Sequence, residues 1–237
     1  MTLHILATGT SRGIGLAVTT ALAGDGVRLV GQATAAIDAN TIAADLDRPG
    51  AAADLWDEAL DRLDGQIDVL INNAGIFEAA PIDLPDEEWL VAWERTMRVN
   101  LTASAELSRL AVRYWQARAT GGRIVNVASR AAHRGDSPAH WHYAASKAGM
   151  VAMTKTIARG YAAAGILAFA VCPGFTMTGM AENYLASRGG DKLLADIPLG
   201  RVAEPDEVAA AIRFLALDAP ASMTGAVIDI NGASYVR

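Results

Sequence analysis

The sequence predicts a single α/β domain: a doubly wound, mainly parallel seven-stranded sheet with helices on both faces. Short apolar runs alternate with longer segments in which apolar residues recur at helical spacing, a pattern typical of parallel sheets. Glycine-rich or polar clusters follow several of these runs, and such sheets bind ligands outside the carboxyl ends of their strands. The 237 residues fit one domain, which we expect to span 1–237.

Composition and charge exclude several classes of protein. With 52% hydrophobic and 19% charged residues the chain can bury a large core. Its 20 basic and 26 acidic residues give a net charge of −6 and are interspersed, so we expect no nucleic-acid or membrane partner. The apolar runs are too short to span a membrane, and no signal peptide is apparent. Cys172 is the only cysteine, which excludes an intrachain disulfide and favours a cytoplasmic protein.

The first predicted unit consists of a strand, a glycine-rich turn and a helix. An apolar run at 3–7 leads into the turn at 8–15, and a helical pattern then runs to Leu22 before Gly24 and Gly26. Glycines let a backbone approach a pyrophosphate closely, and the helix N-terminus offers unpaired N–H groups. We therefore expect a dinucleotide site here. The Gly-x-x-x-Gly-x-Gly spacing leaves a purely structural turn as the alternative.

The second unit is abbreviated. A strand at 27–30 is followed, after only about ten residues, by a third apolar piece at 41–45. That gap is short for a crossover helix, so we expect one helical turn or a loop. Asp54 is predicted to cap a helix through 56–63 that ends near Gly65.

The remaining predicted elements continue the alternation. A segment from Phe175 to Gly200 has weak periodicity and several turn residues, and we expect a substrate flap at about 175–200. The other strands are expected at 67–71, 123–129, 165–171 and 226–230, and the other helices at 86–118, around Tyr143 and at 204–217.

The stretch from Ser129 to Lys147 carries the strongest chemical signal. Ser129 ends a buried strand, and Tyr143 and Lys147 stand four residues apart, on one face of a helix. An ammonium beside a phenol favours the phenolate, which matters because a free tyrosine titrates near ~10. The pair is therefore a candidate proton donor and its activator. Taken alone, the spacing is a weak signal that is more typical of an exposed surface pair.

A set of motifs in one order identifies a family resemblance. The set comprises Thr8-Gly9 with Gly13-x-Gly15, Asn72-Asn73-Ala74-Gly75, Asn100, Ser129, Tyr143-x-x-x-Lys147, and Pro173-Gly174 with Thr178. Over nearly the whole chain this resembles the short-chain dehydrogenase/reductase family. The stretches 198–201 and 224–232 resemble most its 3-oxoacyl-[acyl carrier protein] reductase branch. The resemblance implies a Rossmann-like fold and an NAD(P)-dependent enzyme acting on CH–OH donors.

The resemblance also implies catalytic roles. Tyr143 would be the general acid, and Lys147 would lower its pKa and bind the nicotinamide ribose. Ser129 would hold the substrate oxygen, and Asn100 would position a water that leads from Lys147 to solvent. From the residues alone, Asn100 is a mid-helix polar residue that fits a local backbone contact as well.

The expected cofactor is NADP. A carboxylate at the end of the second strand would read a ribose 2′-hydroxyl, but the chain has Gly31-Gln-Ala-Thr34 there. Arg12, inside the glycine turn, offers a guanidinium for a 2′-phosphate. NAD is the alternative, with Arg12 facing solvent. The cofactor-binding residues that the resemblance implies are Gly9, Ser11, Arg12, Gly13, Ile14, Gly15, Thr34, Asp45, Leu46, Asn73, Ala74, Gly75, Tyr143, Lys147, Pro173, Gly174, Thr176 and Thr178.

One loop departs from the family pattern. Ser129 and Tyr143 are one residue further apart than the branch leads us to expect, and the loop holds His133, His140, Trp141 and His142. No acid or thiol lies at a suitable spacing for a metal, so we expect no metal and predict that these side chains line the substrate mouth or pack under the flap. Cys172 is expected to be a small buried residue.

The leading functional expectation is an NADP-dependent oxidoreductase that transfers a hydride between nicotinamide and a carbonyl or secondary alcohol, with a 3-oxoacyl-type compound as a candidate substrate. The alternatives are an NAD-dependent dehydrogenase of a sugar, steroid or other secondary alcohol, and a non-catalytic dinucleotide-binding regulatory protein. The resemblance implies a homotetramer, or a homodimer, with the helices near 86–118 and 143–163 at one interface. Their Ala-rich faces fit packing on the sheet equally well.

Overall fold

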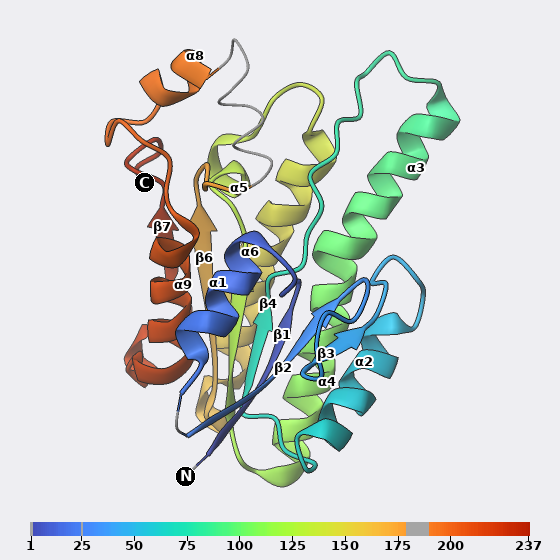
Figure 1. Cartoon of the computed structure of the whole chain (residues 1–237), viewed down its shortest axis with the longest axis vertical. Helices are drawn as coiled ribbons and strands as arrows, with labels where there is room; N and C mark the ends of the chain where they lie inside the picture. Colours follow the sequence, from blue (N-terminus) through green and yellow to red (C-terminus); the bar gives the residue numbers. More distant parts are fainter. Residues whose placement is uncertain (1, 25, 179–189) are drawn as a thin grey trace.

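The computed structural model describes residues 2–24, 26–178 and 190–237, and these form one sheet of seven parallel strands in the order β3-β2-β1-β4-β5-β6-β7 (Figure 1). The order reverses direction between β1 and β4, which creates the switch point at which such sheets bind ligands. The strands are β1 (Leu3–Thr8), β2 (Val27–Ala33), β3 (Thr41–Ala43), β4 (Val69–Asn72), β5 (Gly122–Val127), β6 (Ile166–Pro173) and β7 (Val227–Ile230). The predicted doubly wound fold is confirmed.

Helices cover both faces because alternate strand residues point to opposite sides. Leu6, Leu70 and Ile124 pack under one helical layer, whereas Ile5 and Ile71 pack under the other. The first layer contains α2 (Ala51–Arg62), α4 (Ala103–Arg118) and α6 (Trp141–Tyr161), and the second contains α1 (Gly13–Leu22) and α9 (Pro205–Arg213).

Two predicted boundaries on the β2–α2 side are wrong. β2 continues to Ala33 because Gly31, Gln32 and Ala33 pair with β3. Helix α2 begins at Ala51, directly after Gly50, so Asp54 is not its cap. Asp54 instead lies in the first turn, where a carboxylate favourably meets the positive end of the helix, and it pairs with Arg48 at 2.5 Å. The connection between β2 and β3 is a loop, as expected.

The long predicted helix at 86–118 is interrupted. It consists of α3 (Asp86–Met97), a π-helical turn at Arg98–Thr102 and then α4. One extra residue in that turn rotates the side chains that follow, and π turns often occur at functional sites. Asn100 lies in this turn. A short helix that the sequence pattern did not predict, α5 (Ala131–Arg134), follows β5.

The predicted flap at 175–200 lies partly outside the described residues. Within the described part, Thr176 forms an isolated bridge with Ala203, and α8 spans Gly190–Ala195. Another π turn, Phe214–Asp218, continues α9. Among the described residues, no helix combines the length and apolar character needed to cross a membrane.

Candidate active site

Four groups of predicted site residues follow the carboxyl ends of β1, β4, β5 and β6, which lie at one edge of the sheet (Figure 1). The glycine turn follows β1, the Asn73–Gly75 segment follows β4, Ser129 comes just after β5, and Gly174 follows β6. These strands are neighbours and run in the same direction, so four segments far apart in the sequence meet at one place.

The glycine turn and the Asn73–Ala74 segment are locked together. The Asn73 side-chain amide donates to the carbonyl oxygens of Thr8 (3.0 Å) and Gly9 (2.9 Å), while the Thr8 hydroxyl accepts from the backbone N–H groups of Asn73 and Ala74. Gly9 has φ +69°, and a Cβ there would lie 2.7 Å from the Ala74 Cα. Only glycine permits this approach, so the turn keeps its shape.

Gln32 holds the glycine turn from the other side. Its side-chain oxygen accepts from the Gly9 N–H at 3.0 Å, and its side-chain nitrogen donates to the Ala44 carbonyl at 2.6 Å. Gln32 is buried, so both of its polar atoms need these partners. Sequence reasoning noted the absence of an acid in this strand but missed this role. An amide in the middle of an apolar strand is the signal that could have revealed it.

The predicted cofactor-binding residues near β1, β2 and β3 differ in how accessible their side chains are. Arg12 precedes α1 and is exposed, as is Thr34 just after β2, so both are accessible to a ligand. Asp45 is exposed and accepts from the Asp47 N–H at 3.0 Å. The Leu46 side chain is buried in the core with α2, which leaves only its backbone available to a ligand. Ser11 is exposed and Ile14 half-buried within the turn.

The segment after β6 returns to the glycine turn. Gly174 lies against Asn231, and the Thr176 hydroxyl donates to the Gly174 carbonyl at 3.3 Å. The Thr178 methyl lies so close to Gly13 that a Cβ there would be 2.9 Å from it. Thr178 therefore lies beside the glycine turn, whereas the Thr176 side chain is buried.

Ser129 and Tyr143 form a hydroxyl pair between β5 and α6. The Ser129 hydroxyl accepts from the Ala131 N–H at 3.1 Å and hydrogen-bonds the Tyr143 hydroxyl. Burial raises the pKa of Tyr143 to about 12, and the bond from Ser129 opposes this rise. Burial therefore has the largest effect on the pKa of this phenol.

Lys147 is a buried cation without a carboxylate partner among the described residues. Its Nζ donates to the Val127 carbonyl at 2.8 Å and lies 5.8 Å from the centroid of the Tyr143 ring. Burial lowers the pKa of Lys147 to about 8. Keeping this ammonium inside the protein is unfavourable for stability, which is a common property of groups retained for chemistry.

Asn100 is fixed by its two hydrogen bonds with Ile76. Its Oδ1 accepts from the Ile76 N–H at 2.8 Å, and its Nδ2 donates to the Ile76 carbonyl at 3.0 Å. The side chain is fully buried, and Nδ2 also reaches the Ser146 hydroxyl at 3.3 Å. Asn100 thus contacts a backbone, but the contact is not the local one that the sequence left open, because Ile76 lies on the segment after β4.

A second buried amide network supports the strands beneath the site, and sequence reasoning missed it. Asn72 donates to the Asn126 side-chain oxygen at 2.8 Å and to the Ser108 hydroxyl at 3.1 Å. Asn126 in turn donates to the Thr154 hydroxyl at 2.8 Å. These bonds join β4 and β5 to α4 and α6, so they set the position of the helix that carries Tyr143 and Lys147.

Aromatic rings form one wall next to Tyr143. Phe77 stacks on His140 with ring centroids 3.9 Å apart and meets the Tyr143 ring edge-on at 4.7 Å. His142 is buried, hydrogen-bonds the Glu78 backbone, and stacks against Trp93. Burial lowers the pKa of His140 and of His142.

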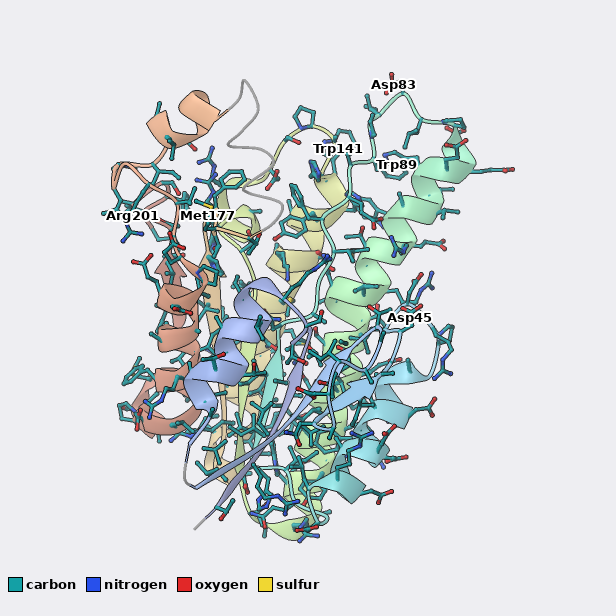
Figure 2. The ribbon with its side chains drawn as sticks, in the orientation of Figure 1. Asp45, Asp83, Trp89, Trp141, Met177 and Arg201 are labelled. Carbon is teal, nitrogen blue, oxygen red and sulfur yellow. The ribbon has the colours of Figure 1, made fainter. Side chains whose placement is uncertain are left out.

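The wall extends to the outer end of α3. There the Trp89 ring contacts the rings of Trp93 and Trp141. Trp89 and Trp141 lie close together at this end of the molecule (Figure 2). We define the aromatic wall as Phe77, Trp89, Trp93, His140, Trp141 and His142. Its position beside Tyr143 fits the prediction that the remodelled loop borders the substrate mouth.

Comparison with known proteins agrees with this geometry. Residues 9–233 match a family model described as enoyl-(acyl carrier protein) reductase. A 3-oxoacyl-[acyl-carrier-protein] reductase of Haemophilus influenzae is 34% identical over 242 residues, covering 98% of this chain and 97% of the relative. The D-threitol dehydrogenase of Mycolicibacterium smegmatis is 35% identical over 245 residues, covering 98% and 92%.

A solved structure is similar over the whole fold. A protein of Agrobacterium tumefaciens, provisionally named as a 2-deoxy-D-gluconate 3-dehydrogenase and solved with bound NADP, superposes with a TM-score of 0.88 at 29% identity. The match covers 99% of this chain and 97% of that one. The relatives, the family model and the fold agree: the chain belongs to the short-chain dehydrogenase/reductase family and is an oxidoreductase.

Proposed function

We propose that the protein is an NADP-dependent oxidoreductase that transfers a hydride between nicotinamide and a carbonyl or secondary alcohol, with Asn100, Ser129, Tyr143 and Lys147 as its catalytic residues. The observation that carries this proposal is the hydrogen-bonded hydroxyl pair of Ser129 and Tyr143 beside the Lys147 ammonium. The pair lies at the same sheet edge as the glycine turn, where a carbonyl can meet a dinucleotide.

Each catalytic residue has a role that its position permits. When bound, the nicotinamide supplies the hydride. During reduction the Ser129 hydroxyl donates to the carbonyl oxygen, and Tyr143 gives that oxygen its phenolic proton as negative charge develops. The Lys147 ammonium stabilises the phenolate that remains. Asn100 Oδ1 and Lys147 Nζ border the same space. Asn100 positions a water there, through which Tyr143 regains its proton from solvent by way of Lys147.

Three observations support NADP. No acid stands at the end of β2, so nothing there repels a 2′-phosphate. Arg12 is exposed next to the glycine turn, where its guanidinium can pair with a phosphate. The solved neighbour carries NADP. The proposed cofactor contacts are those expected from the sequence, with Leu46 contributing through its backbone because its side chain is buried. NAD is the alternative.

Two substrate classes remain, and both have relatives. The apolar aromatic wall beside Tyr143 favours a substrate with an apolar portion, such as a 3-oxoacyl compound, since burying apolar surface contributes about 0.8 kcal/mol per CH₂. The reductase relatives are named for that class. A sugar or polyol is the second candidate, because one relative is named for D-threitol and the solved neighbour is provisionally named for 2-deoxy-D-gluconate.

We further propose a cytoplasmic homotetramer, or a homodimer, that pairs the exposed faces of α4 and α6. Ala145, Ala148 and Ala152 are exposed along one side of α6, and small residues allow close helix packing. Sedimentation giving a monomer at micromolar concentration would exclude this assembly. A cytoplasmic location is compatible with the free thiol of Cys172.

The test has two parts. Calorimetric titration with NADPH and, separately, NADH is expected to show tighter binding of NADPH. Turnover is then measured with a 3-oxoacyl-N-acetylcysteamine thioester and NADPH, and with D-threitol or 2-deoxy-D-gluconate and NADP⁺. Tyr143→Phe is expected to lower turnover by about 10²–10⁴-fold while cofactor binding persists, whereas Tyr161→Phe, at the end of the same helix, serves as the control. Full turnover of Tyr143→Phe would exclude the proposed acid.

A further inference from the structure

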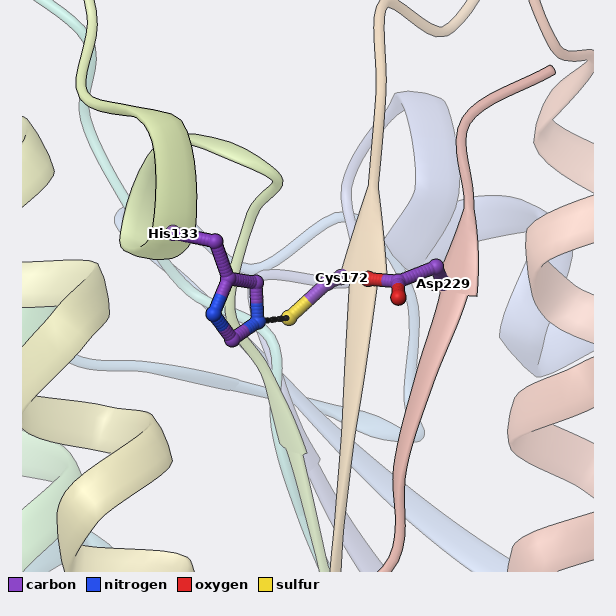
Figure 3. A group of neighbouring side chains, drawn as sticks. All are labelled: His133, Cys172 and Asp229. Atoms are coloured by element: carbon purple, nitrogen blue, oxygen red, sulfur yellow. Dashed lines mark hydrogen bonds between the residues drawn. The ribbon is translucent and has the colours of Figure 1, made fainter. Parts of the chain in front are cut away.

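Three potential metal ligands from separate elements meet behind the active site. His133 comes from α5, Cys172 from β6 and Asp229 from β7, and their ligand atoms all lie within 4.8 Å of one another. Figure 3 shows the three side chains pointing toward one another, with His133 Nε2 3.6 Å from Cys172 Sγ. Cys172 and Asp229 are direct partners in the β6–β7 pairing, so the sheet itself places the thiol beside the carboxylate.

We propose that this cluster binds one Zn²⁺ ion. The donors are an imidazole nitrogen, a thiolate sulfur and a carboxylate oxygen, all of which are ligand types for zinc. With Zn–S near ~2.3 Å and Zn–N near ~2.0–2.1 Å, two ligands of a tetrahedral ion stand about 3.6 Å apart. The observed distance between Nε2 and Sγ is 3.6 Å, so these two atoms already have the separation that a shared zinc ion requires. A solvent molecule completes such three-ligand sites.

Asp229 has one oxygen free for this purpose. Its Oδ2 accepts from Arg237 Nε at 2.9 Å, whereas Oδ1 is buried and has no hydrogen-bond partner among the described residues. A buried carboxylate oxygen without a partner is unfavourable, and a cation would satisfy it. Arg237 would then be the outer partner that orients a ligating carboxylate, an arrangement common around bound metals.

The ring of His133 is held in place. It lies parallel to the Tyr235 ring, with centroids 5.6 Å apart and an interplanar angle of 4°. Cys172 is fully buried. Two of the ligands are thus restrained before any metal arrives, which reduces the entropy lost on binding.

The charge balance is also acceptable. Positive charges of Arg237, Lys147 and Lys155 act on the cluster and oppose a further cation. Zn²⁺ binding, however, converts the thiol to a thiolate: the S–H bond breaks, an S–Zn bond forms and the proton leaves to solvent, with no electron transferred. The ion and its thiolate and carboxylate ligands then carry no net charge, so the surrounding cations are not repelled by a net positive charge at the site.

The position of the site links two functional segments. His133 lies four residues after Ser129, and Cys172 directly precedes Pro173 and Gly174. A metal ion would therefore join the segment that carries the catalytic serine to the segment proposed to contact the cofactor. The site is independent of the proposed function, because it holds neither the substrate nor the cofactor.

Cobalt(II) substitution tests the proposal. Metal-free full-length protein in a thiol-free reductant is titrated with Co²⁺, and one equivalent per chain is expected to produce a thiolate-to-cobalt charge-transfer band with the visible bands of a tetrahedral ion. Added Zn²⁺ should displace the cobalt and remove these bands. Cys172→Ser is expected to abolish the charge-transfer band, and His133→Gln and Asp229→Asn to weaken cobalt binding by at least ~10-fold.

His4→Gln is the matched control, because His4 also pairs with an aspartate, Asp68 at 3.3 Å, but at the other end of the sheet. It should retain the bands and the affinity. Absence of a charge-transfer band in the wild-type protein overturns the proposal on its own, whatever the variants do. Persistence of the band in Cys172→Ser, or unchanged affinity in both His133→Gln and Asp229→Asn that remain folded by circular dichroism, overturns it as well.

Discussion

Asn100 and Lys147 border the same small space over Gly75. A methyl group placed on Gly75 would lie 3.4 Å from Asn100 Oδ1 and 3.4 Å from Lys147 Nζ. One atom comes from the π turn between α3 and α4, and the other comes from α6. Two polar atoms from different helices therefore face one gap next to the segment that follows β4.

Gly75→Ala tests whether this gap serves proton exchange. The added methyl group makes contacts that are tight but tolerable, so the variant is expected to fold and to bind cofactor. The methyl group occupies the space between Asn100 and Lys147. If the return of a proton to Tyr143 then limits turnover, kcat should fall by about 10-fold or more. Gly160→Ala, on the exposed side of α6 with nothing within 4 Å of the new Cβ, is the control and should leave kcat unchanged. Equal kcat values for both variants would contradict the assignment.

Lys147→Met is expected to change how stability depends on pH. The pKa of Lys147 is about 8 in the folded protein, against 10.5 for a lysine free of the fold, so unfolding takes up a proton between these values. Wild-type stability should therefore rise with pH across this window, by about 2 kcal/mol between pH 8 and 9.5, relative to a variant without this amine. At about pH 7 and below, the lysine is protonated in both the folded and the unfolded protein and adds no slope.

Urea unfolding at pH 7, 8, 9 and 9.5 measures this difference. Lys155→Met, which removes an exposed lysine from the same helix, should retain the wild-type slope. If the stability curves of wild type and Lys147→Met run parallel over this range, Lys147 does not have a lowered pKa.

Gln32→Leu is expected to destabilise the glycine turn. The substitution leaves the Gly9 N–H and the Ala44 carbonyl without their partner, at a cost of about 1–3 kcal/mol for each buried group. Thermal or urea unfolding should show a loss of roughly 2–4 kcal/mol, and affinity for the dinucleotide should fall with it. Gln32→Glu, which keeps the acceptor for Gly9, should lose less.

Gln116→Leu provides the comparison, because Gln116 is exposed on α4. Its effect should stay within about 0.5 kcal/mol. A similarly small effect of Gln32→Leu would mean that the turn does not depend on this side chain.

Arg12→Ala is expected to separate the two cofactors. A guanidinium that pairs with a 2′-phosphate contributes roughly 1.5–3 kcal/mol, so affinity for NADPH should fall about 10- to 100-fold while affinity for NADH stays constant. Calorimetric titration of the variant with each dinucleotide measures both values. Arg159→Ala, another exposed arginine, should change neither. An equal loss of affinity for NADPH and NADH would mean that Arg12 binds a phosphate group that both cofactors contain.

Local patterns in the sequence were sufficient to predict the order of the strands and helices and to locate the catalytic and glycine motifs. Alternating strand and helix periodicity predicted the parallel sheet, and the positions of Gly9, Ser129 and Gly174 after apolar runs predicted that they meet at its carboxyl edge. Boundaries were less predictable. Asp54 has the chemistry of a cap, but the backbone conformation of Gly50 begins α2 three residues earlier.

Contacts between distant segments were decided only by the tertiary structure. The Gln32 bridge, the Asn72–Asn126 network and the space over Gly75 each depend on how neighbouring strands and helices pack. The cluster of His133, Cys172 and Asp229 illustrates the reason most clearly. The sequence shows no acid or thiol at a metal-binding spacing from His133, yet the β6–β7 register sets Cys172 beside Asp229, and the turn after β5 brings His133 to both. Periodicity reports which way a side chain faces along its own element, whereas strand register and helix packing determine which side chain it meets.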